Sequence, residues 1–348
     1  MRQFVLASAL ILGIASCAEP PKTAVSFSGQ TMGTTYNVSV LNGIVNVSTL
    51  QAEADQLLQD VNQSLSTYID TSLISHLNAA TDVTTNHPVD NHFIDVYTAS
   101  HAIYESTDGS FNPAVGPLVT AWGFGPEKAE EVTEDQVEKL LSLIDFETFK
   151  LDTSTSTISK EKEGAQLDFS AIAKGYGVDV LGEMLEARGI SDYLVEIGGE
   201  VRSKGMHPAG RPWRIGIDKP TETPGEQREI QMAIEIQNKA MATSGNYRNF
   251  YVRDGKKYVH TINPFTGYPE ESELLSVSVL AEDCMTADAY ATAFMVMGFE
   301  KALATAEMMP NLEAYFITTG DAGAYVETKT EGFPDAFTME QETTGDVE

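Results

Sequence analysis

The chain has 348 residues, enough for two domains of about 150 residues each or for one large two-lobed domain. Apolar residues make up 42% of it, which is ordinary for a globular core and excludes a largely disordered chain. Lys and Arg number 22 against 51 Asp and Glu, so the formal net charge is −29, which argues against nucleic acid as a partner. A phosphate-bearing ligand would need a local positive charge to bind here, either from a cation or from backbone N–H groups that point at the phosphate.

The N-terminus has the layout of a secretory leader. One arginine precedes an apolar run from Phe4 to Ile14, which is too short to span a bilayer, so residues 1–16 are predicted to be a signal peptide. The small residues before Cys17 resemble the bacterial lipoprotein signal, which predicts a lipid on Cys17 and a tether over 17–24. An ordinary signal peptide with an incidental cysteine is the alternative.

The first half of the folded region reads mainly as helices. Two strands with a glycine-containing turn are predicted over 27–43. Apolar residues at helical spacing, with breakers after them, then predict several amphipathic helices. Their expected ranges are 48–69, 91–105, 134–144 and 169–188.

The second half reads as short alternating strands, which is typical of an antiparallel sheet. A small-residue helix over 286–298 and a further segment at 301–309 interrupt the strands, and an acidic tail follows over 333–348. Helices interspersed with mostly antiparallel strands predict an α+β fold of two lobes over 25–332, with the site in a cleft between them. The expected strand segments are 192–206, 212–218, 229–237, 249–264, 274–283, 313–319 and 323–328.

Several common catalytic signatures are missing from the sequence. It contains no G-x-x-x-x-G-K-[ST] and no G-x-G-x-x-G between a strand and a helix, so neither a P-loop nor a dinucleotide-binding Rossmann unit is supported. It has no H-E-x-x-H, and its six histidines show no zinc-ligand spacing. No G-x-S-x-G nucleophile elbow is present.

The stretch "TADAYATAFMVMG" carries the strongest chemical signal. Asp288 and Thr292 are four residues apart, so a helix places both on one face, among alanines too small to shield a charge. An ionised carboxylate there costs several kcal/mol unless it is paired. No Lys or Arg lies within a helical turn of Asp288, so its partner is either a distant basic side chain or a metal ion.

Other polar or flexible residues have a structural reading beside a functional one. Met32 sits in a glycine turn and could simply fill the core, and Tyr68 could plug the end of a helix. Asp168 could be a helix cap, and His260 could be an ordinary strand histidine. Trp122 is best explained by packing.

Taken together, the motifs resemble those of the ApbE family and occur in its order along residues 25–330. They are "TMGTTY", "LSTY", "DGSFNPAVGPLVTAWGFGP", "DFSAIAKGYGVD", "LVEIGGEVRSKG", "ATSGNYRNF", "HTINPFTG" and "TADAYATAFMVMG". Members of that family are FAD:protein FMN transferases, flavin-handling lipoproteins of the bacterial envelope. The resemblance implies a two-lobed, T-fold-like α+β architecture with mostly antiparallel sheets and a cleft that binds FAD.

The resemblance also implies roles for individual residues. Mg²⁺ would be held by the Asp288 carboxylate, the Thr292 hydroxyl and the backbone carbonyls of Ala171 and Ala291. His260 is the leading candidate for the base, because a histidine near its reference pKa of ~6.5 accepts a proton at neutral pH, and Asp168 is the alternative. The implied FAD contacts are Met32, Tyr68, Gly109, Ser110, Phe111, Asp168, Lys174, His260 and Ile262.

The implied reaction is a Mg²⁺-dependent transfer of FMN from FAD to a threonine, or sometimes serine, hydroxyl of a partner protein, with release of AMP. Partners of the family are membrane subunits of the Na⁺-translocating quinone reductase and of Rnf-type redox complexes. A Mg²⁺-dependent FAD pyrophosphatase and a non-catalytic FAD-binding lipoprotein remain open alternatives. The expected location is the periplasmic side of the envelope. The acceptors favour the inner membrane, whereas Ala18 after the cysteine favours the outer one.

Overall fold

A computed structural model describes most of the chain between residues 24 and 337. The described ranges are 24–41, 46–125, 132–220, 229–246, 250–253, 256–259, 261–269, 272–321 and 324–337. The predicted signal peptide, Cys17 and residues 338–348 of the acidic tail therefore lie outside the described residues, as does His260. Among the helices that are described, none combines the length and the apolar character needed to cross a bilayer.

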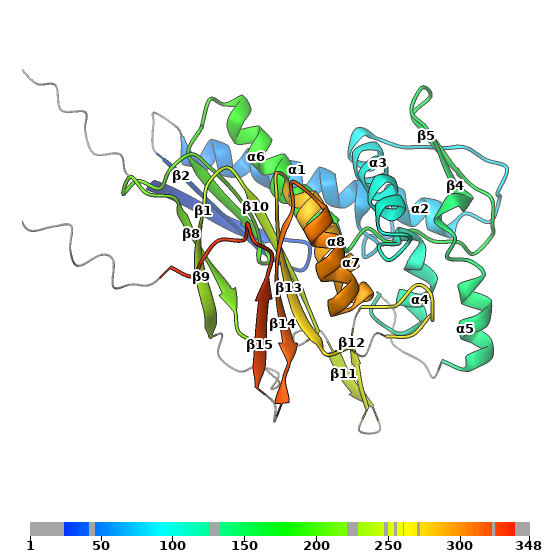
Figure 1. Cartoon of the computed structure of the whole chain (residues 1–348). Coiled ribbons are helices and arrows are strands. Elements are labelled where there is room, and N and C mark those ends of the chain that lie inside the picture. The colour runs from blue at the N-terminus through cyan, green and yellow to red at the C-terminus, as the bar shows by residue number, and fades with distance from the viewer. Residues whose placement is uncertain are drawn as a thin grey trace, which may run out of the picture.

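An eight-stranded antiparallel sheet forms the centre of the fold, in the order β1-β2-β6-β7-β10-β13-β14-β15 (Figure 1). Strands such as β2 and β6 alternate buried with more exposed side chains, as their sequences predict, whereas β13 and β14 are buried along nearly their whole length. The bounds are β1 (Ala24–Thr31), β2 (Thr34–Leu41), β6 (Tyr193–Ile197), β7 (Glu200–Lys204), β10 (Ala240–Gly245), β13 (Leu274–Ala281), β14 (Glu313–Thr319) and β15 (Tyr325–Lys329).

Both faces of this sheet are covered. The helices α1 (Val47–Leu65), α6 (Ala173–Ala187), α7 (Cys284–Met297) and α8 (Phe299–Met308) pack on it (Figure 1). A separate hairpin of β8 (Trp213–Asp218) and β9 (Ile230–Ile236) buries Trp213, Ile217 and Ile234 with sheet residues such as Leu280 and Ile317. This layering removes both apolar faces of the sheet from water.

The remaining elements gather beyond α7, at the right of Figure 1. Their bounds are α2 (Leu73–Ala79), β3 (His87–Pro88), α3 (Asn91–Ser106), α4 (Gly116–Ala121), α5 (Glu134–Leu141), β4 (Phe149–Asp152) and β5 (Thr157–Lys160), with a hairpin of β11 (Phe250–Arg253) and β12 (Lys256–Val259) nearby. One apolar core joins this part to the sheet, since Phe93 and Phe146 belong to the same buried cluster as Phe294 and Phe316. The predicted α+β class, with helices and antiparallel sheets, is confirmed.

Local sequence explains α7, which carries the strongest chemical signal. The Asp283 side chain caps its first turn by accepting a hydrogen bond of 2.7 Å from Thr286 N. The helix ends at Gly298, whose φ of 74° lies in the left-handed region that glycine adopts without strain. Its alanines are small enough for neighbouring helices and strands to approach closely.

Three predicted helix boundaries were wrong. The helix expected over 48–69 ends at Leu65, so Tyr68 lies beyond its end. The helix expected over 169–188 begins only at Ala173, because Asp168 accepts a 2.7 Å hydrogen bond from Ser170 N and so closes a turn ahead of the helix. Asp168 is therefore not the cap of α6, whose N-cap position is Ile172. The helix expected to reach residue 144 ends at Leu141, and the β3–β5 sheet was not predicted.

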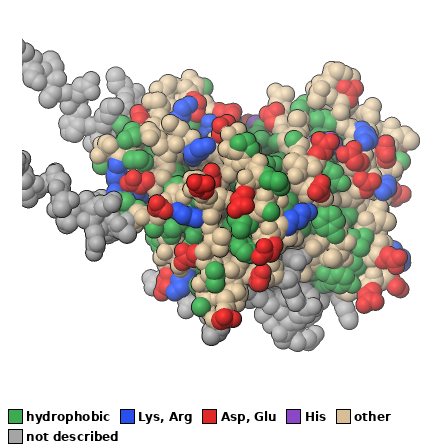
Figure 2. Space-filling model, viewed as in Figure 1, with side chains coloured by type: hydrophobic (Ala, Val, Ile, Leu, Met, Phe, Trp, Pro, Cys, Tyr) green, Lys and Arg blue, Asp and Glu red, His purple; other side chains and the backbone are tan. Residues whose placement is uncertain are grey.

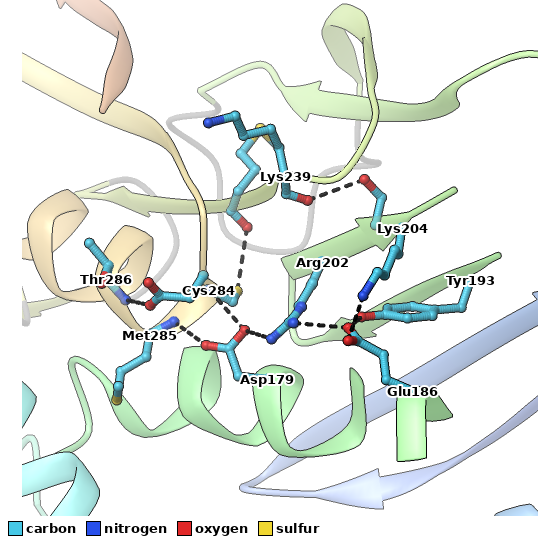
Figure 3. A network of polar contacts seen from close by, with 12 residues as sticks. Asp179, Glu186, Tyr193, Arg202, Lys204, Lys239, Cys284, Met285 and Thr286 are labelled. Atoms are coloured by element: carbon cyan, nitrogen blue, oxygen red, sulfur yellow. Dashed lines mark hydrogen bonds and ion pairs between the residues drawn. The ribbon is translucent and has the colours of Figure 1, made fainter. Parts of the chain in front are cut away.

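A buried polar network fixes α7 against α6 (Figure 3). Asp179 of α6 accepts hydrogen bonds from Cys284 N at 3.0 Å and Met285 N at 2.8 Å, so it caps the first turn of α7. Arg202 of β7 donates to Asp179 at 2.9 Å and to Glu186 at 3.1 Å. A carboxylate on one helix thus sets the starting point of the other.

We expect Asp179→Ala to lower the free energy of unfolding by about 3 kcal/mol, because it removes a helix cap and leaves Arg202 short of a buried partner. Urea denaturation followed by circular dichroism measures the loss. Lys150→Ala is the control, because its ion pair with Glu147 is exposed and worth less than about 1 kcal/mol. Equal stability of the two variants would contradict a structural role for Asp179.

Candidate active site

The buried carboxylate of Asp288 lies where α7 crosses the start of α6. Only 2% of its surface is exposed. Its Oδ2 atom accepts a 3.0 Å hydrogen bond from Gly175 N, and its Oδ1 atom lies 3.6 Å from Lys174 Nζ. The sequence left a basic side chain or a metal as possible partners, and the tertiary structure supplies the basic side chain from another helix.

Glycine makes this approach of the two helices possible. A Cβ atom on Gly175 would lie 2.3 Å from the Cys284 carbonyl oxygen, well inside van der Waals contact. Gly175 N belongs to the first turn of α6, whose donors have no intrahelical acceptor, so its bond to Asp288 satisfies both groups. Helix contact and carboxylate orientation therefore depend on the same residue.

A second carboxylate, Glu200 at the start of β7, completes the charged cluster. Its Oε1 atom lies 3.3 Å from Lys174 Nζ, and its side chain is only 5% exposed. The buried Oε2 atom has no hydrogen-bond partner among the described residues. We call Lys174, Glu200 and Asp288 the charged triad.

The four predicted metal ligands differ in how free their oxygens are. Thr292 follows Asp288 by one turn of α7, and its hydroxyl lies 3.2 Å from Ser244 Oγ. Ala171 precedes the N-cap of α6, so its carbonyl lies outside the hydrogen-bond ladder of that helix. Ala291 is fully buried inside α7, where its carbonyl belongs to the ladder and only its second lone pair remains.

This donor set fits Mg²⁺ better than a transition metal. Mg²⁺ takes oxygen ligands, commonly one or two carboxylates with waters and substrate phosphates completing the octahedron. Asp288 offers a carboxylate, Thr292 a hydroxyl and Ala171 a carbonyl. The described residues include no cluster of three or more His, Cys, Asp or Glu side chains suited to a metal. A Mg²⁺ ion bound here would therefore need phosphate oxygens of the substrate to complete its coordination.

Two of the predicted FAD-contact segments have strained backbone. Met32 has a φ of 49° and is followed by Gly33 at 71°, in the tight turn between β1 and β2 where Asn-Gly is preferred. Asp108 has a φ of 49° and precedes Gly109 at 78°. Left-handed backbone at a non-glycine residue costs of order 1 kcal/mol and clusters at ligand sites.

The side chains in these turns differ in burial and in hydrogen-bond partners. Met32 is half-buried and packs against both main core clusters. The Ser110 hydroxyl is buried and lacks a hydrogen-bond partner within the described part of the chain, whereas Phe111 is buried in the core. Phe265 lies against the backbone at Gly109 and is itself 59% exposed.

An open cavity of about 210 Å³ lies beside Thr67, the residue before Tyr68. Thr67 and Asp168 line this cavity, together with Asn78 and Gln166. Tyr68 is 61% exposed and donates a 2.9 Å hydrogen bond to the Phe124 carbonyl. Partial desolvation and the Asp168 charge raise the pKa of the Tyr68 phenol, so it stays protonated and able to donate.

Ile262 is buried and forms an isolated bridge with Pro269, closing the loop that carries Phe265 and Tyr268. Trp122 packs in the same cluster, and its Nε1 atom donates a 2.8 Å hydrogen bond to the Gly267 carbonyl. Both contacts agree with its predicted packing role.

Comparison with known proteins identifies the family to which this chain belongs. The family model described as the ApbE family matches residues 32–316. The chain belongs to the ApbE family. It is therefore an enzyme of the flavin-transferase class, and the family resemblance seen in the sequence is confirmed.

Among curated ApbE relatives, an FAD:protein FMN transferase of Vibrio cholerae is 42% identical over 88% of this chain and 91% of its own length. One from Haemophilus influenzae is 40% identical over 92% of this chain and 93% of its own length. The solved flavin transferase ApbE from Vibrio cholerae superposes with a TM-score of 0.80 at 38% identity, covering 89% of this chain and 98% of that one. The apo flavinyl transferase ApbE of Pseudomonas stutzeri gives 0.79 at 33% identity, covering 89% and 95%.

Reasoning from the sequence did not single out Glu200, the third member of the charged triad. It follows the glycines Gly198 and Gly199 between two strands, so the pattern indicated only a hairpin turn. Alternation along β7 would not have flagged it, because Glu200 shares the face of the partly buried Arg202 and Lys204 and is nevertheless buried itself. Its partner Lys174 was predicted to contact FAD, and the structure adds the ion pairs to both carboxylates.

The titration of Glu200 gives a pH-dependent signature. Burial, opposed in part by Lys174, raises the pKa of its carboxyl to about 7. The folded state therefore holds this proton more tightly than the unfolded state, whose pKa is about 4.3. The resulting stabilisation is complete below that value and disappears as the pH rises through about 7.

We therefore expect the free energy of unfolding of the metal-free protein to decrease between pH 4.5 and pH 7 more steeply than that of Glu200→Gln, which has no proton to lose. Urea titrations at several pH values measure both slopes, with Glu186→Gln as the matched control on α6. Identical slopes in wild type and Glu200→Gln would contradict the raised pKa.

Proposed function

We propose that this protein transfers FMN from FAD to a threonine or serine hydroxyl of a partner protein in a Mg²⁺-dependent reaction that releases AMP. Relatives named FAD:protein FMN transferases support the donor and the transferred group. The observation that carries the metal is the buried Asp288 carboxylate, oriented by Gly175 N, with the Thr292 hydroxyl one turn further along α7. The acidic side chains spread over the face shown in Figure 2 explain why a diphosphate needs such a cation.

The reaction breaks one P–O bond and forms another. The acceptor hydroxyl oxygen attacks the phosphorus on the FMN side of the pyrophosphate, and the bond to the AMP phosphate breaks. Mg²⁺ bound at Asp288 and Thr292 supplies Lewis-acid stabilisation of the negative charge on the phosphates. Lys174, next to Asp288, adds a positive charge at the same edge of the site. Positioning and electrostatics supply most of the acceleration in phosphoryl transfer.

The acceptor hydroxyl loses its proton during the attack. We assign the proton to His260, because histidine is the side chain that accepts protons near neutral pH without a large pKa shift. Asp168 is the alternative base. Its Oδ1 atom is already held by Ser170 N and its side chain lines the cavity beside Tyr68, which favours a role in binding FAD. Met32, Tyr68, Ser110 and Ile262 complete the proposed FAD contacts.

We place the protein on the periplasmic side of the envelope, anchored through lipid on Cys17. The acceptors that suit this location are membrane subunits of redox complexes of the Na⁺-translocating quinone reductase or Rnf type. The leader and the short tether over 17–24 support this location, because they would hold the catalytic domain near the membrane surface.

Co-expression with a candidate acceptor tests the proposed reaction. Mass spectrometry should find the mass of FMN added to one threonine of the acceptor, and chromatography should find AMP released in equal amount. Free FMN with or without acceptor, and no FMN attached to the acceptor, would instead support an FAD pyrophosphatase. Stoichiometric FAD binding without any AMP would support a flavin-binding lipoprotein. Either result would overturn the transferase assignment.

A further inference from the structure

The charged triad at the start of α6 has a feature that a simple ligand-binding role leaves unexplained. Lys174 is the second residue of α6, where the helix dipole disfavours a positive charge. Two buried carboxylates from other elements compensate it: Glu200 of β7 at 3.3 Å and Asp288 of α7 at 3.6 Å. The lysine thus bridges two acids that belong to different parts of the site.

The two oxygens of Asp288 are not equivalent. Gly175 N holds Oδ2 at 3.0 Å, whereas Oδ1 faces Lys174 at a distance beyond ordinary hydrogen-bond length. Oδ1 is therefore the oxygen more available to a divalent ion. Two cations sharing that oxygen would repel each other strongly at a few ångströms in a partly desolvated site.

Glu200 offers the lysine another position. Its Oε1 atom already lies near Lys174 Nζ, and its buried Oε2 atom has no hydrogen-bond partner among the described residues. A buried unpartnered carboxylate oxygen is costly, so a shift of the ammonium group toward it would be favourable. The lysine side chain is 29% exposed and long enough to move without displacing the backbone.

We propose that Lys174 is the built-in counter-cation of Asp288, and that a divalent metal displaces it onto Glu200. In the metal-free protein, Lys174 neutralises the buried Asp288 carboxylate. With metal present, Glu200 alone retains the lysine, which then faces the phosphates of the substrate. This inference rests on the proposed Mg²⁺ site and deepens it, since it makes Lys174 and Glu200 positioning residues that set metal affinity.

Metal binding in the absence of FAD tests this exchange, in which the metal ion replaces Lys174 at Asp288 and the lysine moves to Glu200. The protein is the full chain without lipid. Binding of Mn²⁺ is followed by electron paramagnetic resonance, and Mg²⁺ is measured by its competition with Mn²⁺. Lys174→Met should bind Mn²⁺ about tenfold more tightly, because the competing cation is gone. Glu200→Gln should bind it about tenfold more weakly, because Lys174 then has only Asp288 as partner. The metal-free Lys174→Met protein should also melt at a lower temperature and gain more from added Mg²⁺ than wild type.

Two controls separate the exchange from a general effect of charge. Lys204→Met and Glu186→Gln remove the same charges from a neighbouring ion pair of β7 and α6 and should change the affinity by less than about twofold. In the double variant Lys174→Met/Glu200→Gln, the effect of the glutamate substitution should shrink to that of its control, because it acts through the lysine. Lys174→Arg keeps the charge and checks folding.

The outcomes distinguish the inference from the function on which it rests. If wild type binds Mn²⁺ and Mg²⁺ but Lys174→Met has the affinity of Lys204→Met, the exchange is wrong and the metal site stands. If Lys174→Met binds Mn²⁺ more weakly than wild type, the exchange is likewise wrong and the metal site stands. If wild type binds neither ion, both the exchange and the proposed Mg²⁺ dependence are overturned.

Discussion

Asp288→Asn is expected to lower the rate of FMN transfer about a thousandfold, because a Lewis-acid metal contributes several kcal/mol to charge stabilisation in the transition state. Asparagine has the shape of aspartate and can still accept the hydrogen bond from Gly175 N. The loss should therefore come from metal binding rather than from repacking of α6 against α7. Transfer is measured as flavin fluorescence covalently attached to an acceptor, over a range of Mg²⁺ concentrations.

Thr292 provides the matched comparison on the same helix. Thr292→Ser keeps a hydroxyl one turn from Asp288 and should retain most activity, whereas Thr292→Val has the same shape without the hydroxyl and should need more Mg²⁺. Full transfer by Asp288→Asn in the presence of EDTA would show that the buried carboxylate serves packing alone. Circular dichroism of all three variants checks that they fold.

His260→Gln should keep FAD binding within about twofold of wild type and lower the transfer rate by about a hundredfold or more, since a positioned general base contributes 10²–10⁴. Glutamine retains hydrogen-bonding capacity but cannot take up a proton near neutral pH. Single-turnover transfer with saturating FAD separates the chemical step from binding, and fluorescence quenching on titration with FAD measures the affinity.

Asp168→Asn tests the rival base under the same conditions. If Asp168 mainly contacts FAD, this variant should weaken FAD binding while saturating FAD restores most of the single-turnover rate. Near-normal turnover by His260→Gln, combined with a hundredfold loss in Asp168→Asn at saturating FAD, would move the base from His260 to Asp168.

Local sequence patterns predicted many of the helices and strands but not all of their boundaries. Helical spacing and small residues predicted α7, and alternation predicted strands such as β6, whose burial follows the same period. In β13 and β14 nearly every residue is buried, because both faces of the sheet are covered there. The start of α6 was placed too early, because Asp168 binds a backbone amide in a turn that looks like a cap in sequence. The β3–β5 sheet was missed because its strands are short, with two to four residues each.

The sequence by itself determined the family, the α+β class, and the pairing of Asp288 with Thr292 on one helical face, because these depend on motifs and on the period of a single element. Only the tertiary structure decided the partner of Asp288. Lys174 is 114 residues earlier in the chain, and Glu200 lies on a strand between them. Their meeting depends on how closely α6 approaches α7, which Gly175 permits and Asp179 fixes, and no local pattern encodes that distance.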